Sequence, residues 1–451
     1  MSISNTNLSI FDINKVFSKA ETVFFIGVGG VSMSAIAKFC ALCGKKILGY
    51  DRARTHLTEE LEKYGEIRYY STPDNVRGSD LVVYTNAIDE DNHEYKEAKR
   101  LGLPLISRAN LLGYLVSLHK FSCGVSGMHG KSTTTAMLGK IFWDAHKNPT
   151  VFCGGQMQDF HSNFQFGGRE CCIFEACEYQ NSFLSLPCTD AMVLNIDNEH
   201  LDFFGTQEEI IASFQSYIKN ARRVYLNRDD PLSRHLIHRC AITFGLEEGS
   251  TYRGEMCADG KTKVYKCGEL ISHFSLQQAG KHNVYNALGA FAVAYTMGIP
   301  ARVIEKSLSS FTGVAGRMGF LKKNDTGADV FEDYAHHPTE IEASLSTLKG
   351  RYGRVMCVFQ PHTFSRTFHL YPRFIKALSL ADELIIAPTF SAREENVFGI
   401  SEEKLALDCG GEFVADIEKI AHRVASSTCG CVVLMGAGDL SHDVNRLLDL
   451  T

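Results

Sequence analysis

The sequence predicts an α/β protein of three domains, each built on a mainly parallel sheet. Its 451 residues exceed what one hydrophobic core usually supports. Short apolar segments alternate with helical patterns along most of the chain, as parallel sheets require. Two of these segments run directly into glycine-rich loops, at residues 27–32 and 127–130, which is typical of nucleotide-binding domains.

The predicted elements fall into three blocks, separated by short glycine turns. We expect a Rossmann-like N-terminal domain (1–118), a central P-loop ATPase-like domain (119–312) and a Rossmann-like C-terminal domain (313–451), packed around a shared cleft. The first block has apolar strands at 21–28, 45–51, 80–85 and 103–107, and helical patterns at 32–44, 92–101 and 108–118. The second has strands at 121–126, 171–177, 189–197 and 222–227, helices at 131–146 and from Asn283, and a polar hairpin region at 251–275. The third has strands at 329–335, 354–360, 382–388, 412–416 and 431–438, each followed by a helical stretch.

Composition excludes several classes of protein. Lysine and arginine number 46 against 52 acidic residues, a formal net charge of −6, so we expect no binding of nucleic acid. No apolar run reaches the roughly 18 residues that span a bilayer, and the N-terminus lacks a basic segment followed by an apolar core. We therefore expect a cytoplasmic protein with no membrane insertion.

The 15 cysteines are scattered through apolar segments, which indicates small core residues kept reduced. The pairs Cys40/Cys43 and Cys429/Cys431 have the spacing of zinc ligands. The first pair lies in an alanine-rich helical pattern and the second in a glycine turn, so the sequence favours structural cysteines over a zinc site.

The segment 127–134, GMHGKSTT, is the most specific motif, and it lies between an apolar strand and a helical pattern. Its two glycines let backbone N–H groups approach phosphate oxygens, and a helix N-terminus adds partial positive charge. Lys131 supplies a point charge for the terminal phosphates and Ser132 a hydroxyl for Mg²⁺. Val125 stands where the common nucleotide pattern has its first glycine, so this loop is a variant. A glycine turn followed by a chance lysine and serine is the alternative.

Two further side chains are expected beside this loop. Glu175 ends the apolar segment CCIFEAC, and His200 follows the segment MVLNID. The carboxyl ends of parallel strands lie on the ligand side of such a sheet. A carboxylate there can hold Mg²⁺, and a neutral imidazole can hold a second metal or a phosphate-bound water. Taken alone, either residue is more often a surface or core residue, but the neighbouring phosphate loop favours function. Glu178 and Asp202 are expected to be structural or supporting.

The first glycine loop, residues 27–32, resembles a dinucleotide fingerprint. Asp51 stands at the end of the next strand, where a ribose-binding acid belongs. Because Ser32 replaces the third small residue of that fingerprint, the loop predicts a nucleotide or phosphate group on a helix N-terminus and not NAD in particular. A bare tight turn is the alternative.

The third block carries two polar motifs, DYAHHPTE at 333–340 and QPHTFSR at 360–366, each at the end of a strand. Asp333 lies at the first strand end, while His362 and Arg366 follow the second. The two adjacent histidines of the first motif diverge and lack a third ligand, which argues against a transition metal. An arginine at such a place suits a carboxylate or phosphate, or caps a neighbouring acid.

Six motifs occur in the order found in the Mur ligases, and six ordered motifs are far more specific than any one of them. They are GMHGKSTTT, EACEYQNSFL, NIDNEHLDFF, GKHNVYNALGA, GRMGFL and DYAHHPTE. The resemblance extends from about residue 21 to about residue 440. Within the family, FIGVGGVSMSAIA and FQPHTFSRT are most similar to the member that adds L-alanine to UDP-N-acetylmuramate.

This resemblance implies an ATP-dependent amide ligase of peptidoglycan synthesis. The first domain would hold the UDP-sugar and the second ATP with Mg²⁺, while the third would close over both and help to bind the amino acid. The implied partners are UDP-N-acetylmuramate and L-alanine, and a homodimer is compatible with the resemblance.

The resemblance also implies roles for individual residues. Catalysis would involve Lys131, Glu175, His200 and Arg317, with Ser132, Glu175 and His200 as metal ligands. ATP would be bound by Gly127, Met128, His129, Gly130, Lys131, Ser132, Thr133, His282, Asn283, Asn286, Arg317 and Asp333. The UDP-sugar would be bound by Gly27, Gly29, Gly30, Ser32, Asp51 and Arg108. The amino acid and the sugar carboxylate would face Tyr334, His362 and Arg366.

Met128, Gly316 and Thr363 depart from the family pattern, which has threonine at the first position and arginine at the other two. The alternatives are a sister ligase that uses glycine, serine or a recycled tripeptide, and a nucleotide-gated ATPase that does not ligate. A nicotinamide dehydrogenase would explain the first glycine loop but would leave the second without a role.

Overall fold

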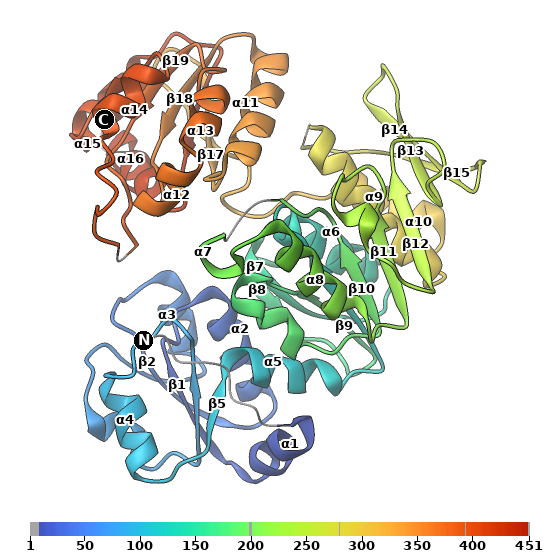
Figure 1. Cartoon of the computed structure of the whole chain (residues 1–451), viewed down its shortest axis with the longest axis vertical. Helices are drawn as coiled ribbons and strands as arrows, with labels where there is room; N and C mark the ends of the chain where they lie inside the picture. Colours follow the sequence, from blue (N-terminus) through green and yellow to red (C-terminus); the bar gives the residue numbers. More distant parts are fainter. Residues whose placement is uncertain (1–8, 198–200, 279, 393, 450–451) are drawn as a thin grey trace. The chain divides into compact units, whose positions relative to one another are not determined.

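The computed structural model describes residues 9–197, 201–278, 280–392 and 394–449, with the side chains of residues 201 and 202 excepted. The described residues form three sheets, of five, ten and six strands, with helices packed on them (Figure 1). This confirms the predicted α/β class with three mainly parallel sheets. Segments Gln278–His282 and Gly313–Thr451 form one compact unit, and the rest of the described chain forms another.

The first sheet has the strand order β3-β2-β1-β4-β5, and all its pairs are parallel. Its strands are β1 (Thr22–Ile26), β2 (Lys46–Tyr50), β3 (Gly65–Arg68), β4 (Leu81–Tyr84) and β5 (Leu105–Ser107). The order reverses between β1 and β4, and ligands of open α/β sheets bind at the carboxyl ends of the strands at such a switch point. The first glycine loop follows β1 and therefore lies at this switch point.

Helices cover both faces of the first sheet because successive residues of its strands point to opposite sides. Val23 and Phe25 of β1 share a core cluster with helices α1 (Ile10–Lys19), α2 (Val31–Leu42) and α5 (Arg108–Ser117). Phe24 and Ile26 point the other way and pack with α4 (His93–Arg100). The short helix α3 (His56–Leu61) follows β2.

The second sheet has the order β15-β14-β13-β12-β11-β10-β6-β9-β7-β8. Its strands are β6 (Phe121–Ser126), β7 (Thr150–Met157), β8 (Ser162–Gln165), β9 (Cys171–Glu175), β10 (Asp190–Val193), β11 (Arg223–Asn227), β12 (Ala241–Gly245), β13 (Tyr252–Met256), β14 (Lys261–Lys266) and β15 (Glu269–Ser275). The strands from β7 to β13 are parallel neighbours, whereas β8 at one edge and β14 and β15 at the other are antiparallel. The predicted polar hairpin region is confirmed as β13, β14 and β15.

The helices of the second block are α6 (Lys131–Asp144), α7 (Leu201–Phe204), α8 (Gln207–Ile218), α9 (Lys281–Thr296) and α10 (Ala301–Ser309). Its central strands β6, β9, β10 and β11 are buried along nearly their whole length because helices cover both faces of the sheet. One buried cluster continues from α2 of the first block into Phe152, Phe164 and Phe174 of the second. The first two sheets therefore share a core.

The third sheet has the order β16-β17-β21-β18-β19-β20, antiparallel only between β16 and β17. Its strands are β16 (Gly319–Lys323), β17 (Asp329–Asp333), β18 (Val355–Phe359), β19 (Glu383–Ile386), β20 (Glu412–Phe413) and β21 (Cys431–Met435). One face packs on α11 (Pro338–Tyr352), α13 (Tyr371–Leu378) and α14 (Glu402–Asp408), and the other on α15 (Ile417–Ser426) and α16 (Leu440–Leu448). The short helix α12 (Phe364–His369) follows β18.

The structure also describes the state of the cysteines and the length of the apolar helices. All fifteen cysteines lie in the described part of the chain and are free, nine of them buried. No helix of the described residues is long and apolar enough to cross a membrane.

Candidate active site

The loop between β6 and α6 turns at two glycines. Gly127 has a φ of +135° and Gly130 a φ of +82°, a region of backbone conformation that favours glycine. A Cβ atom at Gly130 would also collide with Oδ1 of Asn286, a buried residue of α9. Helix α6 begins at Lys131, so the N–H groups of its first turn point toward the loop and are suited to an anion.

Asn195, which follows β10, holds this loop in place. Its Oδ1 accepts a hydrogen bond from the His129 backbone N–H at 2.9 Å, and its Nδ2 donates to the His129 carbonyl at 3.0 Å. Its own carbonyl accepts from Met128 N–H at 3.3 Å. Groups held this firmly are preorganised for binding. The role of Asn195 was not predicted from the sequence, although its place at the end of a strand beside β6 was a usable signal.

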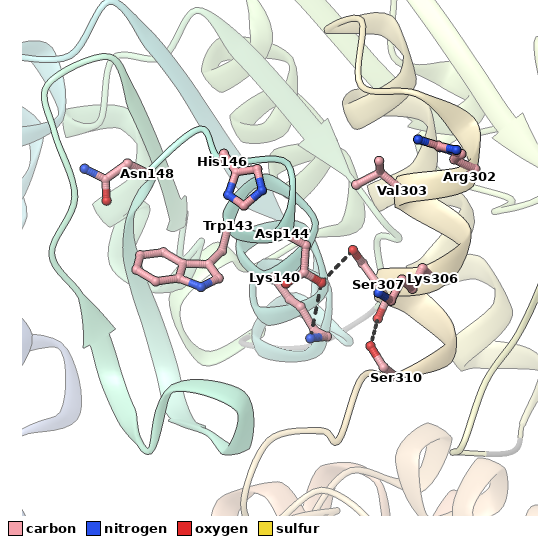
Figure 2. A pocket seen from close by; sticks show the side chains of 10 residues that line it. All are labelled: Lys140, Trp143, Asp144, His146, Asn148, Arg302, Val303, Lys306, Ser307 and Ser310. Carbon is pink, nitrogen blue, oxygen red and sulfur yellow. Dashed lines mark hydrogen bonds and ion pairs between the residues drawn. The ribbon is translucent and has the colours of Figure 1, made fainter.

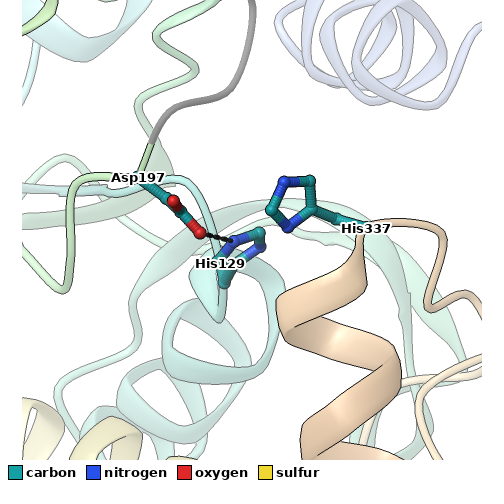
Figure 3. Close-up of side chains that lie close together, drawn as sticks. All are labelled: His129, Asp197 and His337. Atoms are coloured by element: carbon teal, nitrogen blue, oxygen red, sulfur yellow. Dashed lines mark hydrogen bonds and ion pairs between the residues drawn. The ribbon is translucent and has the colours of Figure 1, made fainter. Parts of the chain in front are cut away.

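The side chain of His129 is also tied to the segment after β10. Its Nε2 lies 3.4 Å from Oδ2 of Asp197, at the outer limit of a hydrogen bond (Figure 3). Backbone and side chain of this loop residue are thus both held by residues 195–197. Asp197 is a second residue at this site whose role was not predicted from the sequence.

Lys131 points back over the loop and pairs with a buried acid. Its Nζ donates to the carbonyls of Gly127 at 2.6 Å and Met128 at 3.1 Å. It also lies 3.0 Å from Oε2 of Glu178, whose side chain is only 2% exposed. Glu178 was expected to be structural or supporting, and the structure places it as the ion-pair partner of Lys131.

Glu175 and Ser132 lie at the same edge of the second sheet. Glu175 is the last residue of β9, Ser132 stands in the first turn of α6, and β6 and β9 are parallel neighbours. Oε1 of Glu175 accepts a short hydrogen bond from Gly154 N–H of β7, which fixes its carboxylate. Carboxylate and hydroxyl oxygens are the ligand types that Mg²⁺ prefers. His200 lies outside the described residues.

Two buried asparagines complete this edge. Asn286 contacts Gly130 as described above, and its Nδ2 lies 3.4 Å from Oδ1 of Asn283. Both side chains belong to the first turns of α9. The structure therefore places Asn286 against the phosphate loop and Asn283 beside Asn286, while their contact with ATP stays a prediction.

The carboxylate of Asp51 is hydrogen-bonded to the first glycine loop. Asp51 Oδ2 accepts a hydrogen bond from Gly29 N–H at 2.8 Å, and its Oδ1 accepts from Ala53 N–H at 3.2 Å. Gly27 has a φ of +77°, and its N–H donates to the Tyr50 carbonyl at 2.8 Å. Asp51 is thus held against the loop in which the nucleotide was expected.

Arg108, at the start of α5, contacts Ser32 of the same loop. Its Nη1 donates to Ser32 Oγ at 2.9 Å, and burial lowers the pKa of its guanidinium. No carboxylate of the described residues forms an ion pair with it. A partly buried cation without a countercharge, beside the N-terminus of α2, is suited to an anionic ligand.

In the second compact unit, Asp333 and Arg317 each have a defined partner. Asp333 ends β17, and its carboxylate accepts a short hydrogen bond from Ser344 Oγ. Burial raises its pKa to about 6. Arg317 lies 3.3 Å from Oε1 of Glu340, and its guanidinium stacks 5.0 Å from the centre of the Tyr334 ring.

His282, at the beginning of α9, belongs to the same unit. Burial lowers the pKa of its imidazole, which is the largest effect, and the charges of Glu340 and Arg317 act on it in opposite directions. A neutral imidazole can accept a hydrogen bond through one ring nitrogen and donate through the other.

His362 and Arg366 form a pair after β18. Arg366 Nη1 donates to His362 Nδ1 at 3.0 Å, and the imidazole stacks on Phe390 at 5.6 Å between ring centres. Burial lowers the pKa of His362 to about 4, so the ring is neutral near pH 7 and can accept this bond. Thr363 between them has a φ of +67°, which is rare for a β-branched residue.

Comparison with known proteins identifies the family. Residues 22–120 match the model "Mur ligase family, catalytic domain", residues 125–294 match "Mur ligase middle domain", and residues 316–438 match "Mur ligase, glutamate ligase domain". The chain belongs to the Mur ligase family.

Relatives of this Mur ligase share nearly its whole length. It is 39% identical to a UDP-N-acetylmuramate–L-alanine ligase of Caldicellulosiruptor saccharolyticus, over 94% of this chain and 98% of the relative. The crystal structure of UDP-N-acetylmuramate–alanine ligase from Thermotoga maritima superposes with a TM-score of 0.83 at 28% identity, covering 95% of this chain and 98% of that one. A murein peptide ligase from Psychrobacter arcticus has a TM-score of 0.72 at 20% identity, covers 95% of this chain and 98% of its own, and shows the fold alone.

A pocket of about 920 Å³ lies away from the phosphate loop of this Mur ligase (Figure 2). It is lined by α6 and α10 near the carboxyl end of α6, whereas the phosphate loop is at the amino end, about 20 Å along the helix. In its lining, Asp144 accepts a hydrogen bond from Ser307 Oγ at 2.7 Å and pairs with Lys140 at 3.3 Å. The pocket is therefore not part of the nucleotide site.

Proposed function

We propose that this chain is an ATP-dependent ligase that joins L-alanine to the carboxylate of UDP-N-acetylmuramate, a step in the synthesis of peptidoglycan precursors. The observation that carries this proposal is the match, over nearly the full length, to relatives named for this ligation. The phosphate loop with Lys131 supports the ATP requirement. The proposed domains are 1–118 for the UDP-sugar, 119–312 for ATP and 313–451 for the amino acid.

A carboxylate is a poor acyl donor at neutral pH, so the reaction needs an activated intermediate. In the proposed sequence, an oxygen of the sugar carboxylate attacks the γ-phosphorus of ATP and ADP leaves. The resulting acyl phosphate is then attacked at its carbonyl carbon by the amine of L-alanine. Inorganic phosphate leaves, the amine loses a proton, and the amide bond forms. The protein's contribution to such a reaction is mainly positioning and charge neutralisation.

The phosphate loop supplies the first part of that contribution. The backbone N–H groups around Gly130 and the ammonium of Lys131 are suited to the β- and γ-phosphates. Lys131 bonds two loop carbonyls and Glu178 in the structure, and a triphosphate would offer it oxygens of higher negative charge. Arg317 is proposed to neutralise the γ-phosphate further.

Ser132 and Glu175, with His200, are proposed to hold Mg²⁺. The fit rests on their donor chemistry and on the fixed carboxylate of Glu175, which Gly154 N–H restrains. Bound Mg²⁺ neutralises charge on the phosphate oxygens. Asp333 is proposed to contact the nucleotide ribose, and His282, Asn283 and Asn286 the rest of the ATP site.

The remaining site residues are proposed to hold the two other substrates. Arg108, with Ser32, Asp51 and the loop glycines, would bind the diphosphate and ribose of the UDP-sugar. A guanidinium carries five N–H donors, and one of those of Arg366 donates a hydrogen bond to His362. This bond is proposed to orient the remaining donors of Arg366 toward a substrate carboxylate. Tyr334 would line the same side.

A phosphate-release assay tests the proposal and its alternatives. We expect ATP-dependent release of phosphate only when UDP-N-acetylmuramate and L-alanine are both present, with a product whose mass equals the two substrates minus water. Glycine, L-serine and a muropeptide-derived tripeptide are tested in place of L-alanine. Faster turnover with one of these would assign a sister ligase, and phosphate release without any amine would assign an ATPase.

A further inference from the structure

A buried lysine joins the helix of the first glycine loop to the edge of the second sheet. Lys38 lies on α2, and its side chain is 2% exposed. Its Nζ lies 2.5 Å from Glu60 Oε2, on α3 of the same block. It also donates to Asn163 Oδ1 at 3.0 Å and to Ser162 Oγ at 3.3 Å, both at the start of β8. One ammonium group therefore connects three elements.

Asn163 extends this connection to the first turn of α2. It is itself fully buried, and its Nδ2 donates to the Val31 carbonyl at 2.6 Å and to Ser34 Oγ at 3.0 Å. Val31 directly follows Gly30, and Ser34 lies in the same helical turn. The Nδ2 group of Asn163 thus bonds the first turn of α2, which follows the glycine loop, and its Oδ1 bonds Lys38.

Strand β8 forms a hairpin with β7, and β7 contacts Glu175, a proposed metal ligand. β8 pairs with β7, with Phe164 opposite Phe152 and Ser162 opposite Met157. Gly154 of β7 donates its N–H to the carboxylate of Glu175. The β7–β8 hairpin therefore contacts the first glycine loop's helix on one side and Glu175 on the other.

Apolar contacts also join α2 to this hairpin. Phe39 of α2 packs on Phe152 and Phe166, with ring centres 5.8 Å and 5.5 Å apart. Such contacts are non-directional and tolerate small shifts. A buried ammonium costs free energy unless all its partners are in place, and burial lowers the pKa of Lys38. The directional contacts of Lys38 and Asn163 therefore select one position of α2 on the hairpin.

We propose that Lys38 and Asn163 are positioning residues that align the UDP-sugar loop with the edge of the sheet that carries Glu175 and the phosphate loop. This inference rests on the proposed function, because it assumes that the first glycine loop binds the UDP-sugar. In this proposal, neither Lys38 nor Asn163 contacts a substrate. Their effect is on the alignment of two sites that each bind their own ligand.

The test separates alignment from binding and from stability. Lys38→Met keeps the aliphatic stem and removes the ammonium. We expect kcat for ligation to fall about tenfold or more, because a misplacement of reacting groups by about 1 Å can cost that much. The dissociation constants of UDP-N-acetylmuramate and of a non-hydrolysable ATP analogue, measured separately by calorimetry, stay within twofold of wild type, with unchanged stoichiometry. Asn163→Ser is measured in the same way, and it replaces Lys38→Met if that variant does not fold.

Lys46→Met is the matched control, because Lys46 is an exposed lysine at the start of β2 in the same block. It removes one positive charge without touching the network, so wild-type kcat and affinities are expected. The inference is overturned if kcat per bound site is unchanged in Lys38→Met and Asn163→Ser. It is also overturned if affinity and kcat fall together, which indicates a lost site. Failure of wild type itself to ligate would instead refute the proposed function.

Discussion

The ammonium of Lys131 lies 3.0 Å from Oε2 of Glu178, and the side chains of the two residues are 15% and 2% exposed. A carboxylate this deeply buried requires a positive partner, since removing one member of a buried pair leaves an uncompensated charge. The lysine expected to bind phosphate is therefore also the countercharge of Glu178. A single substitution at Lys131 changes both properties at once.

Lys131→Met and the double variant Lys131→Met/Glu178→Gln separate the two properties. We expect Lys131→Met to reduce the free energy of unfolding by about 3 kcal/mol. Ligation should fall at least about 10²-fold because a preorganised charge is lost. The double variant should recover most of the thermal midpoint and none of the activity. Thermal unfolding followed by circular dichroism and phosphate release provide the two measurements.

Lys120→Met is the control for this pair, because Lys120 forms an exposed ion pair with Glu170 at 2.7 Å. Exposed pairs contribute at most about 1 kcal/mol, so this variant should resemble wild type in both measurements. Equal thermal midpoints for Lys131→Met and wild type would show that Glu178 does not depend on the lysine.

The Gly130→Ala substitution tests the shape of the phosphate loop. Gly130 has a φ of +82°, and a Cβ atom would collide with Asn286. We expect the KM for ATP to rise about tenfold or more and stability to fall by about 1–3 kcal/mol. Gly350→Ala on α11 is the matched control, since a Cβ there meets nothing within 4 Å. It should leave KM unchanged and stabilise α11 by a few tenths to about 1 kcal/mol. An unchanged KM for ATP in Gly130→Ala would contradict the assignment of this loop.

Some parts of the site could be predicted from sequence because their signals are local. Each glycine loop stands between an apolar strand and a helix within a few residues, so the loop and its place at the sheet edge follow from the pattern. The partner of Lys131 had no such signal. Glu178 is followed by Gln180 and Asn181 in left-handed conformations, with φ of +52° and +55°, which non-glycine residues adopt rarely.

The β7–β8 hairpin was not predicted for a related reason. Its residues, 150–165, include two adjacent glycines and several polar residues and lack a clear alternation. Its order comes from pairing with β9 and from contacts with α2, such as those of Asn163, which only the tertiary structure provides. The position of Asp51, in contrast, was predicted from the sequence, and its carboxylate bonds the first glycine loop. Its contact with a ribose stays a prediction.

Arg108→Met is expected to weaken substrate binding while stabilising the protein. Arg108 donates to Ser32 Oγ at 2.9 Å and has no ion-pair partner within the described part of the chain. A partly buried cation without a countercharge costs free energy, so its removal should raise the thermal midpoint. The dissociation constant of UDP-N-acetylmuramate should rise about tenfold or more. Calorimetry and thermal unfolding measure these two effects.

Arg100→Met serves as the control for Arg108, because Arg100 is exposed on α4 and pairs with Glu97 at 2.7 Å. Its affinity for the UDP-sugar should equal that of wild type. A lower thermal midpoint in Arg108→Met, together with unchanged affinity, would show that Arg108 is a structural residue.

The buried carboxyl group of Asp333 predicts how the free energy of unfolding depends on pH. Burial raises its pKa to about 6 from an ordinary value of 3.8, so the folded protein holds the proton to higher pH than the unfolded chain does. The contribution of Asp333 to stability therefore falls as pH rises from about 4 to about 6 and is level above that. Asp333→Asn does not titrate. The free energy of unfolding of wild type, minus that of the variant, should decrease by up to about 3 kcal/mol between pH 4 and pH 7.

The same titration should appear in nucleotide binding, since a deprotonated carboxylate accepts hydrogen bonds from ribose hydroxyls better than the neutral acid does. We expect the KM of wild type for ATP to fall as pH rises through about 6 and that of Asp333→Asn to be higher and flat. His336 and His362 do not interfere, because burial lowers their pKa values to about 3 and about 4. Unfolding measured from pH 4 to pH 7.5 and initial rates measured from pH 5 to pH 7.5 test the two effects. Parallel profiles for wild type and variant would place the titrating group elsewhere.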